Sequence, residues 1–368
     1  MTDQLPIIQQ RRRTARNKTP EELGQSFPIS IIIPFFNCLD QLAQTLPALA
    51  QNDLRQCEVL LIDDGSTDGS GKLAQDFDLG APSRLLPIPS RSGPAEARNL
   101  GLREAQHPHV FFLDADIVLP AKALFWMRES LDIYQHRSEV QGVLGVYSAN
   151  VPGAGFFTHY KNLYTCHLYN STQTLSPFVH TPIFCVHKQA IEAVGGFDGR
   201  LETAEDFRLG ISLGSQGYRF VIDRRIQGIH LKTYSLGSIL REDKRRITDL
   251  RRVNLAPNER AFYYQANRWG RILSVLLPGT TLLCLILSLA VPIFRMLAIV
   301  LALLFYGLNW RFLSFCRRKR GFLFMLVAAL FLPLEMVWAG WAGVIASLFH
   351  RRFPAKSEKD VVLPGPPA

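Results

Sequence analysis

The first third of the chain alternates short apolar runs with longer amphipathic segments. Residues 29–33 and 58–62 are dominated by Ile, Val and Leu and end at turn-forming residues, which is typical of buried strands. We predict further strands at 84–88 and 110–113, and helices at 39–50, 71–77 and 94–105. Strands that alternate with helices indicate an α/β domain with a mostly parallel central sheet.

The stretch that follows is less regular, but it still alternates between the two periodicities. We predict strands at 142–149, 178–187 and 218–222, and helices at 160–169 and 203–214. The α/β domain therefore extends to about residue 240.

The C-terminal region has a different pattern, because charged residues almost vanish from it. Residues 272–294 and 296–310 carry no charge, and Glu335 is the one charged residue between 321 and 349. Since a helix needs about 20 apolar residues to cross a bilayer, we predict three spans near 272–291, 292–310 and 322–349. Core helices of a soluble domain are the alternative interpretation.

Five basic residues lie between the second and third predicted spans, where we expect a loop. The positive-inside rule places this loop in the cytosol, together with the α/β domain. The side of the membrane on which residues 351–368 lie stays open. The basic residues are Arg311, Arg317, Arg318, Lys319 and Arg320.

The net charge of +10 is distributed unevenly along the chain. Between residues 27 and 232, 17 Lys and Arg face 21 Asp and Glu, so the net charge there is −4. The surplus lies in the basic arm 1–26, in the stretch 241–271 and around the apolar segments. A nucleic-acid binder normally carries its basic patch on the folded domain, so we expect no nucleic acid and infer a membrane surface as partner.

Residues 241–252 combine basic and apolar side chains at helical spacing. This pattern indicates an interfacial amphipathic helix, with an ordinary surface helix as the alternative. The six cysteines include no Cys-x-x-Cys pair, and the N-terminus has no apolar core of a signal peptide. We therefore expect a multi-pass protein of the plasma or inner membrane with a cytoplasmic catalytic domain at 27–240, apolar helices at 272–350 and a tail at 351–368.

Polar side chains follow the ends of several predicted strands, where open α/β sheets bind their ligands. Asp114 and Asp116 form an Asp-x-Asp pair, which suits Mg²⁺ or Mn²⁺ because these ions prefer oxygen ligands. The same spacing is also common in surface turns. The other candidates at strand ends are Asn37, Asp63 and Asp64. The basic candidates are Arg91 and Arg98, which could make charge-assisted contacts to a diphosphate.

Glu205 and Asp206 form a second acidic pair, at the start of a predicted helix. A carboxylate beside a metal–diphosphate site can act as general base toward an acceptor hydroxyl. Acidic residues in a first helical turn can equally serve to match the helix dipole.

Taken in order, the motifs of this chain resemble those of family 2 glycosyltransferases with the GT-A fold. The resemblance covers about residues 27–235. It rests on Pro34-Phe35-Phe36-Asn37, Asp63-Asp64-Gly65-Ser66-Thr67-Asp68, residues 93–101 (GPAEARNLG), Asp114-Ala115-Asp116, Gly195-Gly196-Phe197-Asp198 and Glu205-Asp206.

The resemblance implies an inverting transfer from a nucleotide-diphosphate sugar, with Mg²⁺ or Mn²⁺ as cofactor. It implies Asp206 as the base, Asp114 and Asp116 near or on the metal, and His230 as a metal or phosphate ligand, although a purely structural histidine is nearly as well supported there. The residues that it assigns to the donor site are Pro34, Asn37, Asp63, Asp64, Arg98 and Asp114, and we predict Arg91 and Glu205 as further donor-site residues.

Residues 265–269 fit the Gln-x-x-Arg-Trp pattern of processive polysaccharide synthases, but they lie farther behind Asp206 than in those enzymes. Trp269 and Arg268 are equally explained as interface anchors of the first span. We therefore expect single transfer to a lipid-linked or glycan acceptor, with a processive polysaccharide synthase as the alternative and a non-catalytic membrane scaffold as a more remote one.

Overall fold

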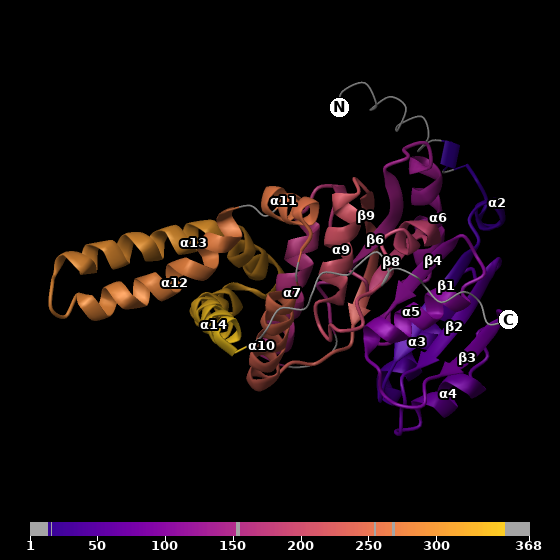
Figure 1. Ribbon diagram of the computed structural model, residues 1–368, viewed down its shortest axis with the longest axis horizontal. Coiled ribbons are helices and arrows are strands. Elements are labelled where there is room, and N and C mark those ends of the chain that lie inside the picture. Colours follow the sequence, from indigo (N-terminus) through magenta and orange to yellow (C-terminus); the bar gives the residue numbers. More distant parts are fainter. Residues whose placement is uncertain (1–13, 16, 152–154, 254, 267–268, 350–368) are drawn as a thin grey trace. The chain divides into compact units, whose positions relative to one another are not determined.

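The computed structural model describes residues 14–15, 17–151, 155–253, 255–266 and 269–349, and these form two compact units. Among the described residues, unit 1 comprises 14–151 and 169–232, and unit 2 comprises 155–168 and 233–349. Figure 1 labels most elements of both units. Residues 155–168 thus group with the C-terminal helices, although in sequence they lie inside the α/β region.

One half of the unit 1 sheet is parallel, in the order β3-β2-β1-β4. Its strands are β1 (Ile29–Phe35), β2 (Cys57–Asp63), β3 (Ser83–Pro87) and β4 (His109–Leu113), and its connecting helices are α3 (Leu39–Ala50), α4 (Ser70–Asp76) and α5 (Pro94–Glu104). All seven match predicted elements. Gly101 lets α5 approach β1, because a Cβ there would lie 2.4 Å from Cγ2 of Ile32.

The other half of the sheet is mixed. Strand β8 (Ile183–His187) runs antiparallel to both β4 and β6 (Val140–Tyr147), and β6 runs parallel to β9 (Arg219–His230). The two-residue strands β5 (Ile117–Val118) and β7 (Leu175–Ser176) pair with β9 and are too short for any periodicity to predict. Helices α6 (Ala123–Tyr134), α8 (Lys188–Glu192) and α9 (Glu205–Ser215) complete unit 1.

Two predicted strands have other boundaries than expected. The strand predicted at 178–187 begins only at Ile183. The strand predicted at 218–222 continues to His230. Its pairing with β6 shifts register, because Leu144 pairs with Ile222 and Val146 with Gln227, so the polar residues after 222 lie in an irregular part of the ladder. There Asp223 pairs with Arg225 at 2.6 Å, so the charges do not end the strand.

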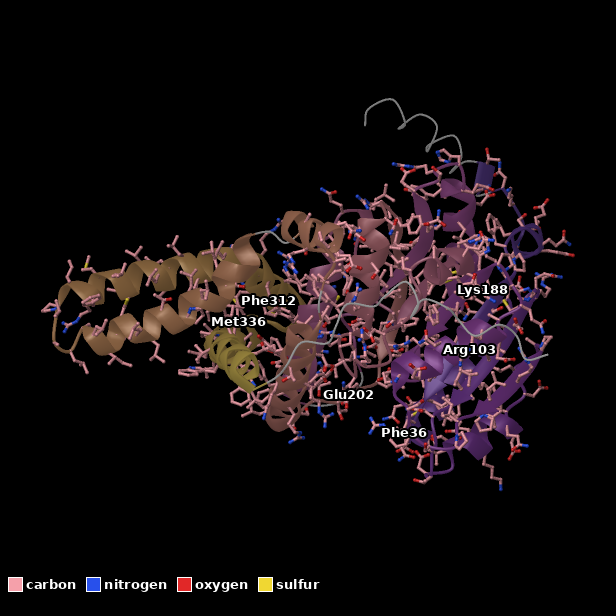
Figure 2. The ribbon with its side chains drawn as sticks, viewed as in Figure 1. Phe36, Arg103, Lys188, Glu202, Phe312 and Met336 are labelled. Atoms are coloured by element: carbon pink, nitrogen blue, oxygen red, sulfur yellow. The ribbon has the colours of Figure 1, made fainter. Side chains whose placement is uncertain are left out.

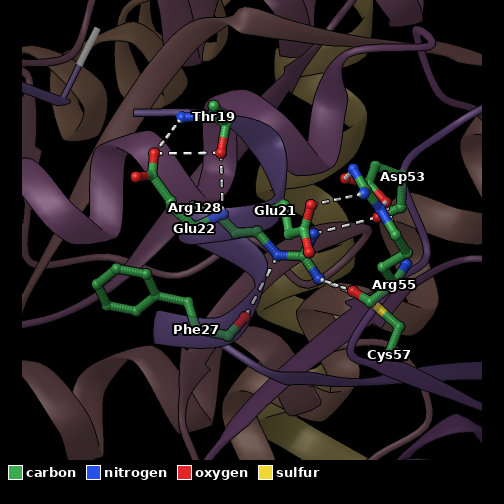
Figure 3. A network of polar contacts seen from close by, with 8 residues as sticks. All are labelled: Thr19, Glu21, Glu22, Phe27, Asp53, Arg55, Cys57 and Arg128. Carbon is green, nitrogen blue, oxygen red and sulfur yellow. Dashed lines mark hydrogen bonds and ion pairs between the residues drawn. The ribbon is translucent and has the colours of Figure 1, made fainter. Parts of the chain in front are cut away.

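The predicted mobile arm is structured from Thr19 onward, which corrects the boundary at residue 26. Helix α2 (Pro20–Ser26) begins with a capping box, in which Glu22 and Thr19 satisfy each other's backbone N–H groups. Figure 3 shows this cap beside Arg128. The Arg128 side chain is 1% exposed, and it donates to the carbonyl groups of Phe27, Asp53 and Arg55. The arginines of the arm, Arg11, Arg12, Arg13 and Arg16, lie outside the described residues.

Unit 2 is helical. It contains most of α7 (Phe156–Asn170), together with α10 (Leu236–Arg252), α11 (Pro257–Ala266), α12 (Trp269–Leu287), α13 (Ile293–Arg320) and α14 (Phe322–Phe349). Two described helices are long and apolar enough to cross a membrane, Ile293–Arg320 and Phe322–Gly343, and the apolar part of α12, Leu273–Leu287, is shorter. Leu276, Leu303 and Leu330 are each more than half exposed, so apolar side chains cover these helices outside as well (Figure 2).

The predicted loop after residue 310 is wrong, because α13 continues through Arg320. Residues 311–320 contain no helix breaker, and basic side chains are favourable at a helix C-terminus. The helix ends at Gly321, whose φ of 90° most other residues avoid. The five basic residues therefore belong to the last turns of a helix.

Glu335 of α14 is buried and has partners within unit 2. It accepts hydrogen bonds from the Tyr160 hydroxyl at 2.6 Å and from Lys161 Nζ at 2.9 Å. Lys161 also pairs with Asp243 at 2.7 Å. The single acidic residue of the last apolar segment thus belongs to a polar cluster that joins α7, α10 and α14.

Candidate active site

The loops that follow β1 and β2 are held together by Asn37. Its φ of 46° is in the left-handed region, which asparagine tolerates better than most residues. Its side-chain oxygen accepts from the Thr67 backbone N–H at 2.8 Å, and its own N–H donates to Ser66 Oγ at 3.1 Å. Pro34, another predicted donor-site residue, lies within β1 opposite Ile62.

The two carboxylates at the end of β2 accept hydrogen bonds from the loops beside them. Asp63 accepts from the Ser66 N–H at 2.8 Å. Asp64 is 4% exposed and accepts from the N–H and hydroxyl groups of Ser92, at 2.7 and 2.8 Å, and from the Gly93 N–H at 2.9 Å. Asp64 therefore fixes the loop between β3 and α5, a role that the sequence did not indicate.

Arg91 is exposed on that same loop. Its guanidinium lies 4.6 Å from the centroid of the Phe36 ring, at the end of β1. A Cβ on Gly65 would lie 3.1 Å from the backbone nitrogen of Arg91, so the loops after β2 and β3 are in close contact. A cation and an aromatic face are thus presented together at the carboxyl ends of the parallel strands.

Arg98 brings together two other predicted site residues, Asp114 and Glu205, whereas the resemblance implied a place for Arg98 in the donor site. Its side chain is 4% exposed, and its two terminal nitrogens donate to Asp114 Oδ1 and Glu205 Oε1, each at 2.8 Å. This arrangement joins α5, the loop after β4 and the first turn of α9. Within the described residues, Arg98 Nε and Glu205 Oε2 are buried without a hydrogen-bond partner.

Burial dominates the titration of these carboxyl groups. It raises the pKa of Glu205 to about 7, because the charge of Arg98 offsets the burial only in part and Asp206 adds a like charge. Burial likewise raises the pKa of Asp114, against the opposing charge of Arg98. Two carboxyl groups and one arginine therefore share this junction, in which Arg98 and Glu205 are buried and Asp114 is partly exposed.

Asp116 and His230 form the second half of the site. Asp116 Oδ2 lies 3.3 Å from His230 Nε2, because β5 pairs Ile117 with His230. The Tyr147 ring stacks on His230 with 4.6 Å between centroids. Burial raises the pKa of Asp116, but the hydrogen bond and charge of His230, with the charge of Lys232, lower it below its ordinary value.

The donor set fits a divalent cation with two protein ligands better than one with three. In the described part of the chain, no group of three or more His, Cys, Asp or Glu is placed to hold a metal ion. Asp114 is engaged by Arg98, whereas Asp116 and His230 offer adjacent oxygen and nitrogen donors. Mg²⁺ and Mn²⁺ commonly take one or two protein ligands and complete their shell with phosphate oxygens and water.

Asp206 lies in the first turn of α9, directly after the Glu205 that Arg98 ties to Asp114. Its side chain is partly exposed and accepts from the neighbouring Phe207 N–H at 2.6 Å. The first turn of α9 is therefore next to the Asp-x-Asp loop. Sequence reasoning missed Thr45, whose hydroxyl holds that loop by donating to the Ala115 carbonyl at 2.8 Å, and Tyr147, because neither lies in a motif.

Comparisons with known proteins bear on the family and the fold of this chain. Residues 30–194 match the family described as glycosyl transferase family 2. The chain is 39% identical over 89 residues to an uncharacterized glycosyltransferase of Haemophilus influenzae, covering 24% of this chain and 36% of the relative. It is 26% identical over 215 residues to the poly-beta-1,6-N-acetyl-D-glucosamine synthase of Staphylococcus aureus, covering 56% of this chain and 51% of the relative. The chain thus spans about half of that relative and less of the other.

Among solved structures, the mannosyltransferase PcManGT from Pyrobaculum calidifontis, in complex with GDP-Man and Mn²⁺, has a similar fold. The TM-score is 0.53 at 17% identity, and the alignment covers 86% of this chain and 87% of that one. At this identity the likeness shows the fold alone, which is GT-A.

Proposed function

Because the chain carries a family 2 glycosyltransferase domain of the GT-A fold, we propose that it transfers a sugar from a nucleotide diphosphate to an acceptor at a membrane surface, with inversion at the anomeric carbon. The observation that carries the proposal is the junction at the strand ends. There, Arg98 ties Asp114 to Glu205, next to the Asp116–His230 pair. The junction combines acidic and basic groups for a charged donor with Asp206 beside them.

In the proposed reaction, the acceptor hydroxyl oxygen attacks the anomeric carbon while the bond from that carbon to the diphosphate oxygen breaks. Asp206 takes the hydroxyl proton as general base. The electron pair of the broken bond leaves with the diphosphate, and a single displacement inverts the configuration. Asp116 and His230 would hold a divalent cation, which supplies neutralisation of the diphosphate charge when bound.

The loops around Asn37, Asp64 and Arg91 form the proposed nucleotide side of the site. Asp64 acts through the loop that it fixes, whereas Arg91 and Phe36 are exposed or partly exposed and offer a charge and an aromatic face. The related mannosyltransferase fold was solved with GDP-Man and Mn²⁺, which supports a nucleotide sugar and a divalent cation here.

We place α12, α13 and α14 in a bilayer, with the glycosyltransferase domain on the cytosolic side, so that α12 and α13 form a hairpin that returns the basic end of α13 to the cytosol. The exposed leucines of these helices and the basic end of α13 support this topology. Such an anchor suits a lipid-linked or membrane-associated acceptor.

Processive synthesis is a second candidate, favoured by the similarity to the poly-beta-1,6-N-acetyl-D-glucosamine synthase. Asn267 and Arg268, inside the Gln-x-x-Arg-Trp pattern, lie outside the described residues. Product length after incubation of the full chain with radiolabelled donor separates one added sugar from a polymer. Donor hydrolysis that depends on Mn²⁺ or Mg²⁺ would exclude a non-catalytic scaffold.

The replacement Asp206→Asn tests the assignment of the base. We expect sugar transfer to fall by about 10²- to 10⁴-fold, the usual contribution of a general base. Nucleotide binding, measured as a thermal shift, should persist. Asp76→Asn on exposed α4 is the matched control. An equal loss of transfer and nucleotide binding would refute the assignment of Asp206 as base.

A further inference from the structure

The C-terminal turns of α13 gather five cations without a carboxylate partner. Arg311, Arg317, Arg318, Lys319 and Arg320 are all exposed, and none forms an ion pair with an acidic group in the described part of the chain. The helix dipole favours cations at this end but is equivalent to only about half a charge. The cluster therefore keeps a strong positive potential that another molecule can neutralise.

Helix α7 adds two histidines to this end of α13, within unit 2. His167 contacts the rings of Phe312 (labelled in Figure 2) and Phe315, with centroids 5.7 and 5.4 Å away. His159 Nδ1 lies 2.9 Å from Arg320 Nη2, which donates to it. The basic end of α13 thus packs beside a second helix, α7, which contributes two further nitrogen-bearing side chains.

The environment disfavours the charged form of both histidines. Burial lowers the pKa of His167, and the charges of Arg311 and Arg318 lower it further. Burial and the charge of Arg320 lower the pKa of His159 in the same way. The two histidines are therefore potential hydrogen-bond donors in a positive potential that a bound anion would reduce.

The length of the apolar part of α13 fixes the depth of this cluster in a bilayer. Residues 296–310 carry no charge and rise roughly 22 Å at 1.5 Å per residue, which is most of the hydrocarbon thickness of about 30 Å, and Arg295 lies at the other end of this run. Trp310, 57% exposed, directly precedes Arg311. Tryptophan and basic residues typically mark the headgroup level, so the cluster lies where lipid phosphates are.

We propose that Arg311, Arg318, Lys319 and Arg320, with His159 and His167 of α7 beside them, form a basic surface that binds the phosphate groups of anionic phospholipid headgroups. The proposal rests on the membrane insertion proposed above. Guanidinium groups bind phosphate through two parallel charge-assisted hydrogen bonds, and the apolar face of α13 accommodates the acyl chains. An anionic lipid, unlike a zwitterionic one, brings a net negative charge to this field.

The test uses the full chain in a neutral detergent, titrated with short-chain phosphatidylglycerol. A ligand that binds the folded state raises the thermal midpoint. We expect such a rise, and no comparable rise with phosphatidylcholine of the same chain length or with inorganic phosphate. For the double variant Arg318→Gln/Lys319→Gln we expect a roughly 30-fold higher phosphatidylglycerol concentration to be needed for the same thermal shift. Each cation near an anionic surface contributes about five-fold to the affinity. The control Lys72→Gln/Arg103→Gln removes the same charges from exposed positions of unit 1.

Equal responses to phosphatidylcholine would show apolar binding and overturn the proposal, and equal responses to inorganic phosphate would show that the lipid is not required. An unchanged response in the double variant would also overturn it. If that variant does not fold, Arg318→Lys should keep the response, and Lys319→Gln should weaken it. Nucleotide binding in the same samples separates this outcome from failure of the proposed function. Lipid binding without any glycosyl transfer would refute the proposed function and leave the lipid proposal intact.

Discussion

Replacing Lys161 by methionine would leave two buried carboxylates without their cation. Lys161 Nζ lies 2.7 Å from Asp243 and 2.9 Å from Glu335, and the three side chains are 15%, 14% and 5% exposed. Burial alone would lower the pKa of Lys161, but the two carboxylates raise it overall, so the amine stays charged. Within the described residues, the bond that remains to Glu335 after the replacement is the one from the Tyr160 hydroxyl.

Breaking a buried ion pair from one side costs about 3–5 kcal/mol. A comparable loss here would lower the melting temperature of unit 2 by roughly 6–20 °C, at about 2–4 °C per kcal/mol. Four of the five tryptophans of the chain lie after residue 268, so tryptophan fluorescence of the protein in detergent reports mainly on this transition.

Lys72→Met on α4 is the matched control, because Lys72 is exposed and such surface changes usually stay within about 0.5 kcal/mol. The double variant Lys161→Met/Glu335→Gln should lose less than the sum of its single variants, since residues of one network are coupled. If Lys161→Met destabilised the protein no more than Lys72→Met, the inference that this cluster holds α7 and α10 to α14 would be wrong.

Two further predictions concern unit 1. The pKa of Glu205, about 7 instead of 4.5, means that the folded protein keeps a proton that the unfolded chain has lost between these pH values. This contribution to the free energy of unfolding is therefore complete below about pH 4.5 and falls as pH rises to 7, by up to about 3 kcal/mol. Denaturation of Glu205→Gln across this range should show a flatter dependence, and an unchanged slope would contradict the assignment. Asp64→Ala removes the acceptor of three hydrogen bonds, so we expect a loss of about 3 kcal/mol or more and weaker nucleotide binding by thermal shift, with Asp76→Ala as control. Wild-type nucleotide affinity in Asp64→Ala would show that the 88–93 loop does not shape the site.

The strands and helices of the parallel half of the sheet were predictable because each is specified by the pattern of its own residues. The apolar runs at 29–33 and 58–62 are continuous, and the helix between them at 39–50 has a clear period, so neighbouring residues suffice to predict them. The mixed half was predicted less well. Strand β9 continues past Ile222 only because β6 and β9 shift register around Asp223 and Arg225, and that depends on a partner strand about 80 residues away.

The candidate site divides in the same way. Strand-end position and motif order indicate Asp63, Asp64, Asp114 and Asp116 as a group from the sequence alone. They did not show that Asp64 is committed to the next loop, or that Arg98 joins Asp114 to a glutamate 107 positions away. Each of these pairings depends on which loops the fold brings together.

The sequence by itself determined the alternation of strands and helices, the acidic strand ends and the apolar C-terminal helices, because periodicity and composition are properties of neighbouring residues. Tertiary structure decided that residues 155–168 join the C-terminal unit, through Tyr160 and Lys161 with Glu335. It also decided that residues 311–320 are helical beside His159 and His167. A buried charge needs a partner wherever the fold can supply one, and no local pattern encodes which distant residue that is.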